Sequence, residues 1–267
     1  MAGKLLIGYD VECESAGVAE NFLTCAGEIH KRLNAPATLF VVGKVLDKYP
    51  QAFRKAQQLG IFDFQQHTYS HVNLKPVKIE GELKKAAGKW RISRELKKAN
   101  GALKRHLGLS AEGLTTPYTH HLGLSDRPDL LKILRKAGVR FVRSFGRDRN
   151  DQTNISLDLQ PFWYDNQGFP EILEFPVQAW KGEYFKGYDD YLCANLDYIA
   201  EHDLVWSFLQ HDSSHHMRGN EIKDPQLHTI ERLIRYAKDK GIILELYKDY
   251  YRRLLNDLDP NETPKAG

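Results

Sequence analysis

Short apolar runs alternate along this chain with longer segments in which apolar residues recur every three or four positions. The runs at residues 4–9, 37–42 and 61–64 are typical of buried strands. The segments at 18–33 and 45–59 each carry one apolar stripe, which predicts a helix after each of the first two strands. Repeated strand–helix units of this length are typical of a parallel sheet or a barrel.

The rest of the chain continues this pattern, with two less regular stretches. A basic, helix-favouring segment covers residues 78–106, although three glycines interrupt it. Residues 144–176 contain several prolines, and we expect short strands and loops there. Further strands are expected at 113–116, 139–142, 204–209 and 242–246, and further helices at 127–137, 188–202, 226–238 and 250–256.

The composition agrees with one large domain. The chain has 267 residues, of which 42% are hydrophobic and 27% charged, and this supplies enough apolar material for one substantial core. We therefore expect a single α/β domain over residues 1–258, followed by a polar C-terminal tail at 259–267.

Charge and hydropathy exclude several classes of partner. The net charge is only +3, and we interpret clusters such as Lys97-Lys98 as solvated helix faces rather than a nucleic-acid surface. No apolar run reaches 18 residues, so we expect no membrane span. The apolar run at 5–8 is too short for a signal peptide, which favours a cytoplasmic location. Three widely spaced cysteines favour reduced thiols, and the oligomeric state is left open.

A pair of histidines follows the third predicted strand. His67 and His71 are four residues apart, so their rings can face one ion if the segment turns. Asp10, Glu12 and Glu14 alternate at the end of the first strand and could point to one side. Three carboxylates at one strand tip repel one another unless a cation lies between them. The sequence therefore predicts a two-histidine, one-carboxylate metal site with open positions for water and substrate.

A third histidine ends a late strand. His211 follows an apolar run, and a histidine at such a position can protonate a leaving nitrogen. Its neighbour Asp212 could orient the loop or tune the ring. We interpret His215 and His216, which come shortly afterwards, as exposed loop residues. The carboxyl ends of parallel strands meet at one edge, where active sites of barrels and open α/β sheets are built.

With these parts in place, the chain resembles the polysaccharide deacetylase family, carbohydrate esterase family 4, also called the NodB-homology domain. The likeness covers roughly residues 4–250 and rests on five segments in the family's order. The His-Ser/Thr-x-x-His and Leu-x-His-Asp motifs are the most specific. The segments are Asp10-Val11-Glu12, residues 37–44, His67-Thr68-Tyr69-Ser70-His71, Leu114-Thr115-Thr116-Pro117-Tyr118 and Leu209-Gln210-His211-Asp212.

This resemblance implies a distorted (β/α) barrel with about seven parallel strands. It also implies one divalent metal ion, usually Zn²⁺, with Co²⁺, Ni²⁺ or Mn²⁺ as alternatives. Carried over to this chain, Glu12, His67 and His71 would be the metal ligands. Asp10 would be the general base, and His211 would be the acid that protonates the departing amine.

The resemblance also suggests substrate-side residues. The backbone N–H of Tyr118, next to Pro117, would stabilise the oxyanion together with the metal. Trp180 could supply an apolar wall, although a core tryptophan is an equal alternative.

Three departures from the family pattern concern this part of the site. Thr115 or Thr116 stands where the family has the arginine that pairs with the base, and we expect Arg143 or Arg147 to replace it. The acidic ligand is displaced by one residue, so Glu14 remains an alternative to Glu12. The family's fourth motif, which usually carries Asp and Trp, is degraded at residues 143–148.

These features predict a metal-dependent hydrolase of amide C–N bonds, most simply an N-deacetylase of an acetylated amino sugar or an oligo- or polysaccharide. A cytoplasmic amidohydrolase acting on a cyclic imide, an allantoin-like compound or a formamide is the alternative. A catalytically inactive carbohydrate-binding homologue is a third hypothesis, supported by the degraded motifs. The expected partner is accordingly a carbohydrate or a small amide.

Overall fold

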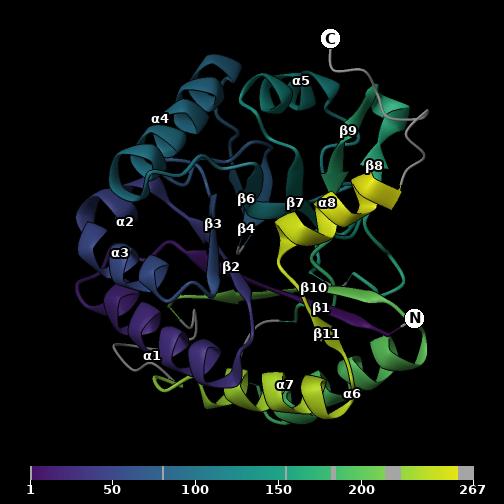
Figure 1. The fold of residues 1–267 in the computed structure, drawn as a ribbon. Helices are drawn as coiled ribbons and strands as arrows, with labels where there is room; N and C mark the ends of the chain where they lie inside the picture. The colour runs from purple at the N-terminus through teal and green to yellow at the C-terminus, as the bar shows by residue number, and fades with distance from the viewer. Residues whose placement is uncertain (1, 80, 154, 182–184, 214–223, 258–267) are drawn as a thin grey trace.

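The computed structural model describes residues 2–79, 81–153, 155–181, 185–213 and 224–257. Strands with a largely buried pattern form a central sheet, and helices pack around it (Figure 1). The strands are β1 (Lys4–Val11), β2 (Ala37–Val41), β3 (Phe62–Gln66), β4 (Val77–Ile79), β5 (Glu82–Lys84), β6 (Gly113–His121), β7 (Phe141–Arg147), β8 (Phe162–Tyr164), β9 (Phe169–Glu174), β10 (Val205–His211) and β11 (Ile243–Leu244).

The helices follow the strands in the predicted alternation. They are α1 (Val18–Leu33), α2 (Gly43–Lys48), α3 (Pro50–Gln58), α4 (Lys89–Leu107), α5 (Pro128–Lys136), a 3₁₀ turn (Asp165–Gln167), α6 (Tyr188–Glu201), α7 (His228–Asp239) and α8 (Tyr247–Asp257). Among the described residues, none of these helices combines the length and the apolar composition that a membrane crossing requires.

The sheet order is β10-β1-β2-β3-β6-β7-β9-β8, with β11 pairing β1. Neighbours from β10 to β9 along this path pair in parallel, and β8 runs antiparallel to β9. The predicted α/β fold with a mostly parallel sheet is thus confirmed. Within the described part of the chain the pairings leave β8 and β10 as the two ends of the path, so they do not close the barrel.

Strand β1 shows how the sequence makes both faces of this sheet. Side chains of a strand alternate between faces. Leu5, Ile7 and Tyr9 pack into the apolar cluster that includes residues of α1, α6 and α7, whereas Leu6 joins a separate interior cluster. Asp10 shares the interior face with Leu6, which places a carboxylate at the inner end of the strand. Burial on both faces explains why the strand reads as a nearly continuous apolar run.

The interior cluster is completed by the last helix. Tyr247, Tyr250 and Tyr251 of α8 pack with Phe40, Phe175 and other apolar residues of the strands. Tyr247 is fully buried, and its ring lies 5.4 Å from the ring of Phe40. Helix α8 therefore fills the sheet interior below the carboxyl edge.

Two of the predicted elements were wrong in detail. The helix expected at 78–106 begins only at Lys89, because the residues before it form the antiparallel β4–β5 hairpin, in which Gly81 has φ +85°. The helix expected at 45–59 is divided into α2 and α3 at Pro50. Proline lacks an N–H and forces the preceding residue, here Tyr49 with φ −124°, out of the helical region.

Candidate active site

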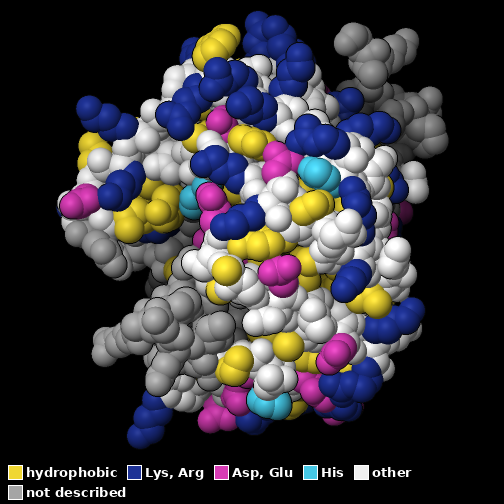
Figure 2. Space-filling view, turned by 90° about the vertical axis from the view of Figure 1, so that its left-hand side faces the viewer, with side chains coloured by type: hydrophobic (Ala, Val, Ile, Leu, Met, Phe, Trp, Pro, Cys, Tyr) yellow, Lys and Arg dark blue, Asp and Glu magenta, His cyan; other side chains and the backbone are white. Residues whose placement is uncertain are grey.

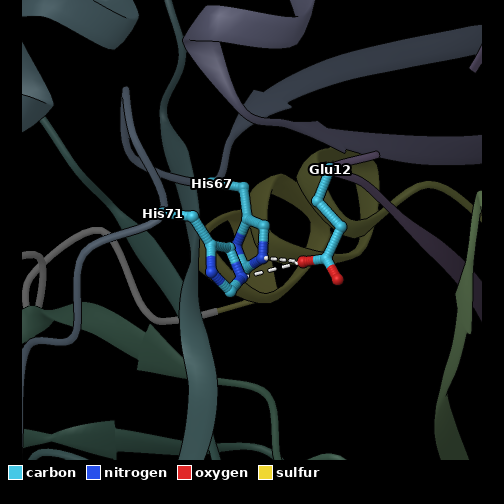
Figure 3. Close-up of side chains that lie close together, drawn as sticks. All are labelled: Glu12, His67 and His71. Carbon is cyan, nitrogen blue, oxygen red and sulfur yellow. Dashed lines mark hydrogen bonds and ion pairs between the residues drawn. The ribbon is translucent and has the colours of Figure 1, made fainter. Parts of the chain in front are cut away.

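The carboxyl ends of β1 and β3 bring three ligand-type side chains together (Figure 3). Oε2 of Glu12 lies 3.1 Å from Nε2 of His67 and 2.8 Å from Nε2 of His71. One potential ligand atom from each residue lies within 4.8 Å of the others. Ligand atoms around a tetrahedral zinc ion are about 3.3 Å apart, so this set could hold a metal ion after a small adjustment.

The surroundings of His67 suit a cation. Its Nδ1 lies 2.9 Å from the carbonyl oxygen of Thr115, which accepts a hydrogen bond and leaves the lone pair of Nε2 facing Glu12. Burial lowers the pKa of His67, but the charges of Asp10 and Glu12 and the hydrogen bonds to Glu12 and Thr115 outweigh this effect and raise the pKa above its ordinary value. A buried position that still favours positive charge fits a bound metal ion.

The two histidines are joined by a turn rather than a helix. Thr68 has φ +58° and His71 has φ +54°, so two residues with side chains occupy the left-handed region. The Thr68 hydroxyl accepts a hydrogen bond from the backbone N–H of Val72 at 3.2 Å. The imidazole centroids are 4.8 Å apart, and both rings point toward the same carboxylate oxygen (Figure 3).

The expected base, Asp10 on β1, has an arginine partner on β7, four strands along the sheet. The guanidinium of Arg143 on β7 donates a hydrogen bond to Oδ1 of Asp10, and its Nε donates to the Thr115 hydroxyl at 2.8 Å. Arg143 is fully buried and the Asp10 side chain is 6% exposed. Arg147, the alternative candidate, instead lies 3.6 Å from the carboxylate of Asp151. The cation missing from β6 is thus supplied by β7.

The acidic side chains after β1 have different surroundings. Glu14 is exposed and lies 4.0 Å from Nζ of Lys44, whereas Glu12 faces the histidines. Asp212 accepts hydrogen bonds from the backbone N–H groups of Glu12 (3.1 Å) and Cys13 (3.0 Å). Burial raises the pKa of Asp212 to about 6, against the lowering effect of these hydrogen bonds. Asp212 therefore orients the segment that carries Glu12.

His211 lies beside the same strand. It ends β10, and its register partner on β1 is Asp10. The ring of Trp180 lies 6.0 Å from the His211 ring, so this tryptophan borders the site. His215 and His216 lie outside the described residues.

Tyr118 borders the site on the side of His71. Its ring lies 5.6 Å from the His71 ring and the residue is 37% exposed. Tyr118 has φ +55°, and its carbonyl oxygen accepts a hydrogen bond from the Thr116 hydroxyl at 2.7 Å. The preceding Pro117 is buried in β6. This turn exposes an aromatic ring next to the candidate metal ligands.

Residues 17–142 match the family model of polysaccharide deacetylases. This part of the chain, a little under half of it, is similar to polysaccharide deacetylases. Within the match lie His67, His71 and the segment with Tyr118. Asp10, Glu12 and the later residues of the site lie outside it, and the fold brings them to the same sheet edge.

Several solved structures share the fold of this chain. A protein described as a polysaccharide deacetylase of Mycobacterium smegmatis has a TM-score of 0.70 and 16% identity, over 96% of this chain and 92% of the other. A similarly described protein of Pseudomonas aeruginosa PAO1 has a TM-score of 0.67 and 13% identity, over 96% and 91%. Puue allantoinase has a TM-score of 0.68 and 13% identity, over 96% and 90%. These low identities show a shared fold.

No curated protein is similar enough in sequence to be matched with this chain. The polysaccharide deacetylase match therefore supports a hydrolytic deacetylase in general, and the substrate has to be argued from the site.

Sequence reasoning missed residues that support this site. Gly8 on β1 leaves the space that Arg143 occupies, since a Cβ there would lie 2.3 Å from its guanidinium. A glycine inside a strand is a signal of such close approach. Glu95 of α4 is bound to the turn between the histidines. The sequence does mark Glu95 as unusual, because it is an acidic residue on the apolar stripe of an otherwise basic helix.

Proposed function

We propose that this protein is a metal-dependent hydrolase of amide C–N bonds, most simply an N-deacetylase of an acetylated amino sugar in a small molecule, oligosaccharide or polysaccharide. The observation that carries the proposal is the group formed by Glu12, His67 and His71 beside the buried Asp10–Arg143 pair. The pair puts a base with a fixed orientation at the sheet edge that holds the metal-type ligands.

Zinc is the ion that this set of donors suits best. Two imidazole nitrogens and one carboxylate are typical of catalytic zinc sites, which keep a further position open. When bound, such an ion would lower the pKa of a water molecule toward neutrality and polarise the scissile carbonyl group. Glu12, His67 and His71 would hold it, with His67 oriented by the carbonyl oxygen of Thr115.

The chain's own groups then have distinct roles in the proposed reaction. Asp10 would accept a proton from the attacking water, and Arg143 holds its carboxylate in place. The backbone N–H of Tyr118 would donate to the oxyanion that forms as the carbonyl carbon becomes tetrahedral. His211, next to Asp10 in register, would give a proton to the departing nitrogen as the C–N bond breaks. The products are a carboxylic acid and a free amine.

The fold also supports a second substrate class. Puue allantoinase matches this chain with a TM-score within 0.02 of the first deacetylase, 0.68 against 0.70. A cyclic imide or allantoin-like ring presents the same bond, an amide C–N bond, to the same groups. Trp180 and Tyr118 could pack against a small ring as well as against a sugar.

A parallel hydrolysis screen tests the proposal. Acetate release from acetylated amino sugars and their oligomers is measured beside hydrolysis of allantoin, hydantoin and formamides, with the metal-stripped protein before and after addition of zinc. We expect zinc-dependent acetate release, and at least about a hundredfold loss of kcat in Asp10→Asn. Hydrolysis that is unchanged by exhaustive chelation would contradict the metal mechanism. Sugar binding without turnover under any metal would favour the inactive homologue.

A further inference from the structure

The turn that carries both histidines is tied to helix α4 by one buried carboxylate. Oε2 of Glu95 accepts hydrogen bonds from the backbone N–H of Ser70 at 2.7 Å and from its hydroxyl at 2.9 Å. Ser70 lies between His67 and His71 in the sequence. We propose that Glu95 is a positioning residue that preorganises these histidines for metal binding. This inference rests on the proposed function.

The charge pattern of α4 sets Glu95 apart. Lys and Arg side chains gather on the upper part of the face in Figure 2, where α4 lies. Glu95 is the single acidic residue of this helix and is only 4% exposed. It lies on the apolar stripe, between the buried residues Ile92 and Ala99. The lysines and arginines of α4 are all exposed: Lys89, Arg91, Arg94, Lys97, Lys98, Lys104 and Arg105.

A buried carboxylate is costly unless its hydrogen bonds are made. On a solvent-facing position of the same helix, Glu95 would have basic neighbours along the helix surface. Its place on the apolar stripe is explained by the two donors of Ser70, one of which is a backbone group of the turn. The contact therefore stabilises the turn between the two histidines and not the exposed face of α4.

The turn needs such support because its backbone is strained. Thr68 and His71 occupy the left-handed region, and such residues cost of order 1–3 kcal/mol each. The N-terminus of α2 holds one side, where the N–H groups of Gly43 and Lys44 donate to the carbonyl oxygens of Thr68 (3.0 Å) and Tyr69 (2.9 Å). Whereas α2 binds carbonyl oxygens of the turn, Glu95 accepts a hydrogen bond from a backbone N–H, that of Ser70. Together α2 and α4 fix two consecutive peptide units, Thr68–Tyr69 and Tyr69–Ser70.

Close packing makes this arrangement specific. A Cβ on Gly43 would lie 2.6 Å from the ring of Tyr69, so the turn rests directly on α2. His67 is also fixed by its hydrogen bond to Thr115 and is buried, whereas the His71 side chain is 31% exposed. Loss of Glu95 should therefore release His71 more than His67. Mutation of residues that orient metal ligands typically costs 10–100-fold in metal affinity.

The test measures zinc affinity by competition with a chromophoric chelator, in the full chain stripped of metal. Glu95→Ala should weaken zinc binding about 10–100-fold. Glu95→Gln keeps one acceptor oxygen, and its zinc affinity should stay within about threefold of the wild type, because a hydrogen bond to a neutral acceptor is weaker than one to a carboxylate but is still formed. Ser70→Ala keeps the backbone donor and should have an intermediate effect. When Glu95 is already alanine, Ser70→Ala should cause little further loss of zinc affinity, because the hydrogen bond is already absent.

Ala102→Gly is the matched control for general weakening of α4. Ala102 is fully buried in the same helix and makes its contacts in the main core cluster, so its replacement destabilises the helix without touching the turn. We expect wild-type zinc affinity in this control. Hydrogen exchange of the Ser70 amide, measured without metal, should become faster in Glu95→Ala and not in Ala102→Gly.

The outcomes separate this inference from the proposed function. Wild-type zinc affinity in Glu95→Ala, or an equal loss in Ala102→Gly, would overturn the role of Glu95 and leave the metal site standing. A wild-type protein that binds no zinc, together with absence of zinc-dependent hydrolysis, would overturn the proposed function and this inference with it.

Discussion

Arg143 and Asp10 form an ion pair inside the sheet, although 133 positions separate them in the sequence. The guanidinium also lies 4.4 Å from the centre of the Phe40 ring and 5.9 Å from that of Tyr247. Aromatic faces attract a cation in this geometry. Arg143 is thus fixed by a carboxylate, by the Thr115 hydroxyl and by two rings, and it links the site to the C-terminal helix.

Removing this arginine should destabilise the fold. Arg143→Ala leaves the buried Asp10 carboxylate without its cation, and breaking a buried pair in this way typically costs about 3–5 kcal/mol. Urea unfolding measures the change. Arg252→Ala is the control, because the ion pair of Arg252 with Glu112 at 2.6 Å is half-exposed, and such pairs contribute at most about 1 kcal/mol. If Arg143→Ala and Arg252→Ala lower the free energy of unfolding equally, the buried pair stabilises the fold no more than an exposed pair does.

Gly8→Ala should displace the Arg143 guanidinium, because the new methyl group would occupy the same space. The added Cβ would lie 2.3 Å from the guanidinium and 3.2 Å from the Phe40 ring, and neither group has an open side to move into. We expect about 1–3 kcal/mol of destabilisation, as for other overpacked cores. Gly101→Ala in α4 meets no atom within 4 Å and should stabilise the protein by about 0.5–1 kcal/mol. Urea unfolding curves in which Gly8→Ala is more stable than Gly101→Ala would show that Gly8 does not make room for Arg143.

Stability should fall in mild acid because of His30. Its Nδ1 bonds the carbonyl oxygen of Ala35 and its Nε2 bonds the Tyr9 hydroxyl, each at 2.7 Å. Burial lowers the pKa of His30 to about 4, against about 6.5 in the unfolded chain. The unfolded state therefore binds more protons as the pH falls from about 6.5 to 4, and about 3 kcal/mol of stability is lost over that window.

The His30→Gln variant isolates this contribution. Its free energy of unfolding should change less between pH 7 and pH 4.5 than that of the wild type, because the other titrating groups are common to both proteins. His202→Gln, at an exposed position, should keep the wild-type slope. If His30→Gln loses as much stability in acid as the wild type, the buried neutral imidazole is not the cause.

The convergence of the site follows from rules that a sequence can express. Asp10, His67 and His211 each come at or just after the end of an apolar run, and a parallel sheet brings such ends to one edge. The paired histidine spacing indicated a metal, and the missing arginine pointed to Arg143 or Arg147, which both belong to the next strand along the sheet. Choosing between these two arginines required the structure. Choosing Glu12 over Glu14 required coordinates, because both carboxylates fit the alternation.

Other features depend on contacts that no local pattern encodes. The β4–β5 hairpin contains helix-favouring residues, among them all three of β5, and its pairing and the left-handed Gly81 exclude a helix there. The position of Glu95 on the apolar stripe of α4 marks it as unusual, but its partner Ser70, 25 residues earlier, is known only from the structure. The Tyr247 ring, near the end of the chain, lies beside Arg143, the ion-pair partner of Asp10. Tertiary contacts decide these cases, and local propensity is a weak guide to them.

Anomalous X-ray scattering at the zinc edge, from crystals grown with zinc, shows whether Glu12, His67 and His71 hold a metal ion. We expect one zinc peak per chain, about 2.0–2.2 Å from Oε2 of Glu12 and from Nε2 of His67 and His71, and no peak there in a His67→Ala crystal. Wild-type crystals in which these three side chains contact one another without a zinc peak, or in which zinc binds elsewhere, would contradict this expectation.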